Sequence, residues 1–274
     1  MAEEAKRGRE VVEEIESKLS KIKYKLMVIS GKGGVGKSFI TANLAVATAL
    51  MGRKVAVFDA DIHGPSIPKI LGVHGERFPV TSSGIVPVLG PLNIKVVSID
   101  FLLPGEDTPV IWRGPLKFAA IRDFLSKVEW GFADYLYVDL PPGTGDEPLS
   151  VAQLVSGLSG AIVVTIPSEL SLLVVKKAVT FARKVGVDVI GVIENMSGFT
   201  CPNCGKTFFV FGKGAGEKIA KDMGVHFLGS IPIDPRIAET CDRGEPFLIK
   251  YPESPAAKAL MKITEKVLEI VESK

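Results

Sequence analysis

Cysteine is scarce in this chain of 274 residues, which has only Cys201, Cys204 and Cys241. Three cysteines cannot build a disulfide framework, and their scarcity fits a reducing compartment better. The charged N-terminus lacks the apolar core of a secretion signal, and no apolar run approaches the roughly 20 residues of a membrane-spanning helix. We therefore expect a soluble, cytoplasmic protein.

Net charge is also small, because 33 basic residues nearly balance 31 acidic ones and leave a formal charge of +2. A balanced surface gives no electrostatic reason to expect nucleic acid as a partner. Hydrophobic residues make up 46% of the chain and charged residues 23%, which supplies a sizeable core and argues against global disorder. We expect neither nucleic acid nor a membrane as a partner.

The first 24 residues are rich in Glu, Lys and Arg. Apolar side chains recur there at helical spacing, at Val11, Val12, Ile15, Leu19 and Ile22. This pattern predicts an amphipathic helix over residues 3–22. We expect residues 1–24 to form a charged helical extension that lies on the domain with one face in solvent.

From residue 25 onward, short apolar runs alternate with segments of helical periodicity. The predicted strands are 26–30, 55–58, 94–99, 135–138, 161–166, 189–193 and 227–231, and the predicted helices are 39–51, 115–128, 148–156, 171–185, 214–223 and 255–271. Continuous apolar strands alternating with helices indicate a mostly parallel sheet covered on both faces. We therefore predict a three-layer, doubly wound α/β fold, with residues 25–274 as a single domain.

Residues 31–38 have the sequence G-K-G-G-V-G-K-S, which matches the phosphate-loop pattern G-x-x-x-x-G-K-[ST] between a predicted strand and a predicted helix. Glycines let successive backbone N–H groups turn towards phosphate oxygens, and the following helix directs its positive end at the same anion. Lys37 is expected to reach the β- and γ-phosphates of ATP, and Ser38 to ligate Mg²⁺. The nucleotide-binding candidates here are Gly33, Gly34, Val35, Gly36, Lys37, Ser38 and Phe39.

Aspartates follow two of the other predicted strands. Asp59 and Asp61 close the second strand, and Asp139 closes the strand at 135–138 in the form of a Walker B carboxylate. Carboxylates at this edge of the sheet can support Mg²⁺ or orient a water molecule, although Asp59 could instead cap the following turn. Gly143, in the turn after Asp139, could offer its N–H to the γ-phosphate.

Asn195 follows the predicted strand 189–193. Its carboxamide has both a donor and an acceptor and therefore suits the edge of an adenine base, although an Asn in this position can also cap a turn.

The pair Cys201 and Cys204 has the spacing C-x-x-C, within a segment of about 198–209 that we expect to be a metal-binding loop. Two thiolates are half of a tetrahedral set, and a symmetric dimer would supply four at its two-fold axis. Four thiolates can hold Zn²⁺ or a [4Fe–4S] cluster, and the chemistry alone does not separate these two. A redox-active pair and a purely structural pair are the other interpretations.

Several motifs together resemble the Mrp/ApbC family of MinD-like P-loop ATPases, which have a deviant Walker A motif and act as iron–sulfur cluster carriers. They are G-K-G-G-V-G-K-S, D-A-D-I-H-G-P-S-I-P, W-R-G-P at residues 112–115, D-L-P-P-G-T-G-D and C-P-N-C. The resemblance extends over residues 22–250. It implies a fold like those of MinD and the nitrogenase iron protein. It also implies a homodimer that hydrolyses ATP slowly and holds a labile [4Fe–4S] cluster for delivery to apo-proteins.

The same resemblance implies individual roles. Lys32 would contact phosphate, often across a dimer interface, and Asp61 would position the attacking water. Asp59 would lie near the magnesium ion without binding it directly. Asn195 would contact adenine, while a loop with Pro232, Ile233 and Asp234 closes over the base.

Two other functions remain open from the sequence. A positioning or partitioning ATPase of the MinD/ParA kind is one alternative, but residues 256–274 lack the basic face of a membrane-surface helix. A zinc-bridged dimer that signals by its nucleotide state is the other.

Overall fold

The computed structural model describes residues 2–82, 84–102 and 114–274. Its centre is an eight-stranded sheet with the order β12-β9-β8-β1-β7-β2-β6-β5, parallel except for β5, which runs antiparallel to β6. The strands of this sheet are β1 Ile22–Ser30, β2 Val55–Asp59, β5 Val88–Leu89, β6 Lys95–Ser98, β7 Ala133–Asp139, β8 Gly160–Thr165, β9 Val189–Glu194 and β12 Phe227–Ser230. Seven of these correspond to predicted strands, so the predicted sheet is confirmed.

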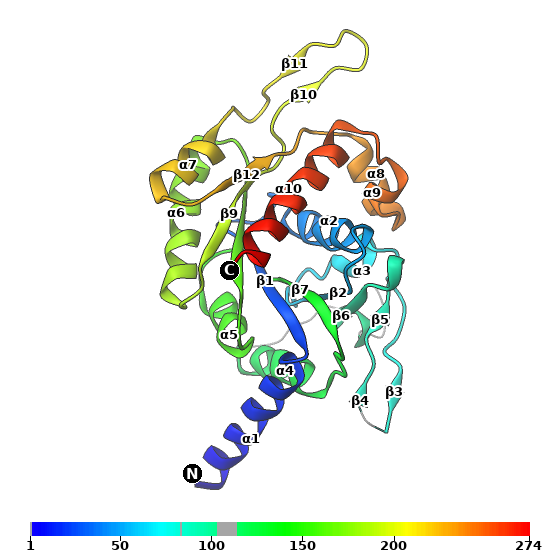
Figure 1. Cartoon of the computed structure of the whole chain (residues 1–274), viewed down its shortest axis with the longest axis vertical. Coiled ribbons are helices and arrows are strands. Elements are labelled where there is room, and N and C mark those ends of the chain that lie inside the picture. The colour runs from blue at the N-terminus through cyan, green and yellow to red at the C-terminus, as the bar shows by residue number, and fades with distance from the viewer. Residues whose placement is uncertain (1, 83, 103–113) are drawn as a thin grey trace.

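Helices cover both faces of the sheet (Figure 1). Helix α2 packs against β1, β2 and β7, and α10 packs against β9, β12 and α2, whereas α6 packs against β1, β8 and β9. The helices are α1 Ala2–Leu19, α2 Lys37–Leu50, α3 Ile67–Ile70, α4 Gly114–Lys127, α5 Asp146–Leu154, α6 Glu169–Lys184, α7 Ala215–Met223, α8 Arg236–Arg243, α9 Phe247–Lys250 and α10 Pro255–Glu272. The three-layer, doubly wound α/β fold is therefore confirmed.

Strand β1 is the point at which the direction of winding changes. From β1 the chain moves to β2 and β6, returns to β7 beside β1, and then builds β8, β9 and β12 on the other side. Ligands of open α/β sheets bind in the crevice at the carboxyl ends of the strands beside such a reversal. The carboxyl ends of β1, β7 and β2 are therefore expected to carry the functional residues.

The N-terminal extension ends earlier than predicted. Strand β1 begins at Ile22, so the last three residues of the predicted extension 1–24 belong to the sheet. In α1, Ile15 and Leu19 are buried and Val11 packs half-buried against the core, while Val12 is 47% exposed. The N-terminal end of α1 projects beyond the other helices (Figure 1).

Two small antiparallel pairs project from the sheet. The first, β3 Val80–Thr81 with β4 Gly84–Ile85, lies in the turn-rich segment before β5. The second, β10 Phe199–Thr200 with β11 Thr207–Phe208, carries the C-x-x-C sequence at its turn. Two short 3-10 helices, η1 Pro91–Asn93 and η2 Ile99–Leu102, complete the described elements. None of the described helices is both long and apolar enough to span a membrane.

Candidate nucleotide and metal sites

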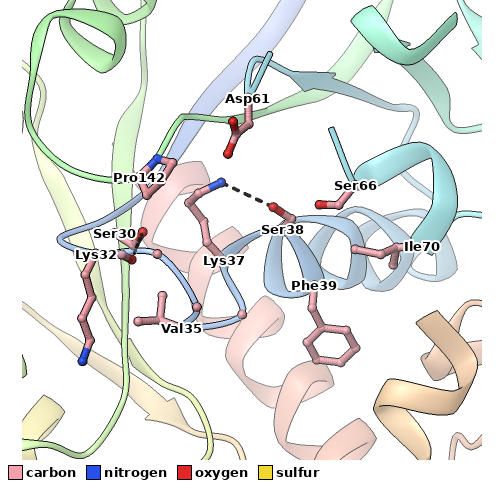
Figure 2. Close-up of a pocket in the computed structure, with 13 residues that line it drawn as sticks. Ser30, Lys32, Val35, Lys37, Ser38, Phe39, Asp61, Ser66, Ile70 and Pro142 are labelled. Atoms are coloured by element: carbon pink, nitrogen blue, oxygen red, sulfur yellow. Dashed lines mark hydrogen bonds between the residues drawn. The ribbon is translucent and has the colours of Figure 1, made fainter. Parts of the chain in front are cut away.

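The phosphate loop connects β1 to α2 and requires glycine for two separate reasons. Gly34 and Gly36 have φ values of 76° and 82°, in the left-handed region that side chains disfavour. A Cβ on Gly36 would also lie 2.3 Å from the Nδ2 atom of Asn195. Because α2 begins at Lys37, its positive end points at the loop. The loop borders a cavity of about 280 Å³ (Figure 2).

Asp139, at the end of β7, is completely buried and is the centre of the site. Its Oδ2 atom accepts hydrogen bonds from Lys37 Nζ and Ser38 Oγ, each at 2.6 Å, and its Oδ1 atom accepts one from Thr41 Oγ1 at 2.6 Å. The three donors lie on the first turns of α2. Thr41 was not predicted, although it lies three residues after Ser38 and therefore on the same helical face.

Asp59 lies directly beside Asp139 in the register of β2 and β7. Its Oδ2 atom accepts hydrogen bonds from the backbone N–H groups of Ser66 and Ile67 at 3.1 Å, so Asp59 does cap the turn that leads into α3. Burial, followed by the negative charge of Asp139, raises the pKa of Asp59 well above its ordinary value. A cation bound here would favour the ionised form, so the structural role and the predicted role near Mg²⁺ are compatible.

Asp61 is half-buried and borders the same cavity as Lys37 and Ser38. Its carboxylate points into the space beside Lys37 (Figure 2). The carboxylate accepts a long hydrogen bond from the N–H of Gly64 to Oδ1 at 3.4 Å, while the backbone N–H of Asp61 donates to Oδ1 of Asp59 at 3.2 Å. The carboxylate therefore keeps acceptor capacity that a water molecule could use, and its water-positioning role stays a prediction.

The phosphate contacts of Lys32 and Gly143 stay predictions. The side chain of Lys32 extends away from Lys37 and Ser38 (Figure 2). The N–H of Gly143, whose φ is 93°, donates to the carbonyl of Ser30 at 2.9 Å. Contact of this N–H with a γ-phosphate would require that hydrogen bond to break.

Asn195 follows β9 and is 5% exposed. Its Nδ2 atom donates to the carbonyl of Val35 in the phosphate loop at 2.9 Å. It is therefore part of the support of the loop, and its predicted contact with adenine stays a prediction.

The predicted base loop at 232–234 follows β12. Asp234 forms a bidentate ion pair with Arg236, with Nε–Oδ1 and Nη2–Oδ2 distances of 2.9 and 2.6 Å. The hydrogen bonds from Arg236 lower the pKa of Asp234. Pro232 and Ile233 border a second cavity, of about 540 Å³, whose other wall includes Phe199 and Pro202. The base loop therefore lies against the segment that carries the cysteines.

Cys201 and Cys204 lie in the turn between β10 and β11, at the far end of a projecting hairpin (Figure 1). The turn is closed by hydrogen bonds from Cys201 N–H to the carbonyl of Lys206 and from Gly205 N–H to the carbonyl of Cys201, both at 2.9 Å. Hydrogen bonds from the N–H groups of Cys204 and Asn203 lower the pKa of Cys201. Cys204 is exposed, and all three cysteines are free.

The position of Cys201 and Cys204 in a turn helps to distinguish the possible roles of the pair. Redox-active C-x-x-C pairs lie at a helix N-terminus, whereas this pair lies in a turn between two strands. Across residues 2–82, 84–102 and 114–274, no three His, Cys, Asp or Glu side chains come together as a metal site.

Cys241 is in α8, where burial raises the pKa of its thiol to about 11. The W-R-G-P motif falls partly outside the described residues, because Trp112 and Arg113 precede the first described residue of α4.

The geometry around Asp139 is that of a P-loop NTPase, in which the loop lysine and the loop serine converge on a strand-end aspartate. The chain belongs to the NUBPL iron-transfer P-loop NTPase family, whose model matches residues 21–268.

Individual relatives agree with this assignment. The chain is 57% identical to the iron–sulfur cluster carrier protein of Saccharolobus solfataricus over 259 residues, which are 94% of this chain and 88% of that protein. A nucleotide-binding protein of Archaeoglobus fulgidus, solved with ADP and cobalt, is 44% identical with a TM-score of 0.77, over 86% of this chain and 92% of that one. The MinD protein of Pyrococcus horikoshii, solved with Mg-ADP, is 26% identical with a TM-score of 0.65, over 90% of this chain and 96% of that one.

The two kinds of thiol are expected to titrate differently. Alkylation by iodoacetamide requires the thiolate, so its rate rises as the pH passes through the pKa of each thiol. Because the pKa of Cys201 is lowered and that of Cys241 is raised to about 11, Cys201 should reach half of its maximal rate at a lower pH than Cys241. Mass spectrometry after timed labelling would measure both rates. Equal dependence of the two alkylation rates on pH would show that the turn does not activate Cys201.

Loss of the loop lysine should weaken ATP binding. Hydrogen bonds to charged groups contribute about 1.5–3 kcal/mol each, so Lys37→Ala should raise the Kd for Mg-ATP by roughly 10- to 100-fold. Isothermal titration calorimetry would measure the change, with Lys69→Ala, an exposed lysine of α3, as the control. An unchanged Kd would contradict the phosphate-binding role.

Proposed function

We propose that this protein is an ATPase that carries a [4Fe–4S] cluster between the cysteine pairs of two identical subunits and transfers it to apo-proteins in the cytoplasm. The observation that carries the proposal is the exposed C-x-x-C turn on a P-loop NTPase, with one thiol already biased towards the thiolate. Family membership and the carrier name of a relative 57% identical support it. In this reaction the cluster is cargo rather than a resident cofactor.

The proposal requires two copies of the chain. Cys201 and Cys204 provide two thiolates, and a cluster of this type takes four. A two-fold axis beside the hairpin turns would bring both cysteine pairs together. Each subunit would then contribute the same two thiols, as an isologous dimer requires. The outward direction of Lys32 suits its proposed contact with phosphate in the partner subunit's site (Figure 2).

In this proposal, residues of the chain itself bind the phosphates, the magnesium ion, the water and the base. Backbone N–H groups of residues 33–39 surround the phosphates, and Lys37 leaves Asp139 to pair with the β- and γ-phosphates. The donor set of Ser38 Oγ with Asp139 and Asp59 nearby fits Mg²⁺, which prefers oxygen ligands and would neutralise charge on the phosphates. Asp61 orients the water, and Asn195 with residues 232–234 holds the base.

The cysteine pair is tested by anaerobic reconstitution with iron and sulfide. Cys201→Ser/Cys204→Ser should lose the broad visible absorption and the bound iron of the wild-type protein, because both cluster ligands of each subunit are gone. Cys241→Ser is the matched control and should retain both signals. A double variant that still bound the cluster would refute the proposal, and zinc in place of iron in protein purified without oxygen would favour the zinc-bridged dimer.

The hydrolytic role of Asp61 is tested separately. Positioned acid–base groups contribute typically 10²–10⁴-fold to a rate, so Asp61→Ala should lower the rate of phosphate release from ATP by roughly 10²-fold. Binding of Mg-ATP should be nearly unchanged, because no hydrogen bond joins Asp61 to Lys37 or Ser38 in the described part of the chain. Release of labelled phosphate would measure the rate, and a variant with the wild-type rate would exclude the water-positioning role.

A further inference from the structure

The segment from residue 197 to residue 214, here called the cysteine hairpin, stands away from the body of the protein (Figure 1). Every side chain from Pro202 to Lys213 is exposed. The direction in which the hairpin presents Cys201 and Cys204 therefore depends on how its two ends are attached.

The first end of the hairpin is attached to the base loop by backbone hydrogen bonds. Ser197 N–H donates to the carbonyl of Ile231, and Ile233 N–H donates to the carbonyl of Gly198, both at 2.8 Å. Phe199 and Ile233 then form an isolated parallel bridge. The segment that receives the hairpin, residues 231–233, overlaps the loop 232–234 that is proposed to close over the nucleotide base.

Glu194 joins the two ends of the hairpin. It closes β9 and is 1% exposed. Its Oε1 atom accepts a hydrogen bond from Ser197 Oγ at 2.6 Å, and its Oε2 atom accepts one from Gly216 N–H at 2.7 Å. Ser197 begins the hairpin, and Gly216 lies in the first turn of α7, directly after the hairpin ends. One buried carboxylate therefore fixes both legs.

Glycine at residue 216 is part of this arrangement. A Cβ on Gly216 would lie 2.9 Å from the Cβ atom of Glu194. The absence of a side chain thus lets the start of α7 approach the carboxylate closely enough for the N–H of Gly216 to donate to it.

The next residue along the chain contacts the phosphate loop. Asn195 donates to Val35 in the phosphate loop at 2.9 Å. The end of β9 therefore connects two sites, because Glu194 holds the cysteine hairpin while Asn195 holds the phosphate loop.

We propose that Glu194 is a positioning residue through which occupation of the base site sets how firmly the cysteine hairpin is held. This inference rests on the proposed function, in which Asn195 and residues 232–234 contact the base. A bound base restrains those residues, and the backbone bonds to Ser197 and Gly198 pass the restraint to the first end of the hairpin. The carboxylate of Glu194 then passes it from Ser197 to Gly216 at the second end. A ligand shifts such an equilibrium only by its different affinity for the two states, so the base favours the firmly held hairpin and slows loss of the cargo.

The base and the phosphates can be tested apart. Hydrogen–deuterium exchange is measured on the full chain without metal cargo, with Mg-ADP or with magnesium tripolyphosphate, which has no base. We expect ADP to slow exchange at Ser197, Ile233 and Gly216, and tripolyphosphate to slow exchange in the phosphate loop alone. Unchanged hairpin amides with ADP, or equal protection by tripolyphosphate, would overturn the proposal.

Variants separate positioning from simple structural support. Glu194→Ala removes both anchoring hydrogen bonds and should abolish the ADP-dependent protection at saturating ADP. Glu194→Gln should restore it, because its amide can donate to Ser197 Oγ and accept from Gly216 N–H. Ser197→Ala removes one anchor without leaving a buried N–H unpaired, so it decides the matter if Glu194→Ala does not fold. Glu217→Gln, an exposed neighbour on α7, is the matched control. Protection that persists in Glu194→Ala or Ser197→Ala would refute the role of Glu194.

Loss of the cargo gives a second readout. In reconstituted wild-type protein, an iron chelator should remove the cluster more slowly with ADP than without it, and Ser197→Ala should reduce this difference. A cluster whose loss does not depend on ADP would overturn the coupling and leave the carrier function standing. Absence of any cluster, with ADP-dependent protection of the hairpin, would overturn the carrier function and leave the coupling standing.

Discussion

The buried carboxylate of Asp139 is the constraint on which the nucleotide site depends. A charge with no exposed surface is very costly unless it is paired and hydrogen-bonded, and Lys37, Ser38 and Thr41 together satisfy it. These bonds hold the start of α2 against the end of β7 and so set the shape of the phosphate loop. A phosphate that draws Lys37 away leaves Asp139 short of positive charge, and a divalent cation at Ser38 would restore the balance.

The cysteine hairpin has the opposite physical character. The phosphate loop follows a buried strand, whereas the cysteines lie in the turn between two short strands, where the residues from Pro202 to Lys213 are exposed. The proposed shared cluster would need thiols that can meet those of another subunit and later release their cargo. A rigid sheet with a projecting hairpin separates these demands, and the end of β9 is where the two parts join.

Most of the sheet and the phosphate loop could be predicted from the sequence, because buried parallel strands and the phosphate-loop motif are local patterns. The start of β1 could not, since Lys23 and Lys25 interrupt its apolar pattern. Lys25 is nevertheless buried, with Nζ donating to the carbonyls of Leu19 at the end of α1 and of Ile22 at the start of β1. The anchoring by Glu194 could not be predicted either, because Gly216 lies 22 residues further along the chain. Contacts of this kind arise from folding and leave no periodic pattern.

The ends of the sheet have a consequence for how the protein can associate. At one edge β5 has only two residues and runs antiparallel to β6. At the other edge the pairing of β12 with β9 shifts register between Phe227 and Gly229. Short and irregular edges are poor templates for another strand. Growth of the sheet from one molecule into the next is therefore disfavoured, and a chain that assembles through side chains can do so without the hazard of open-ended polymerisation.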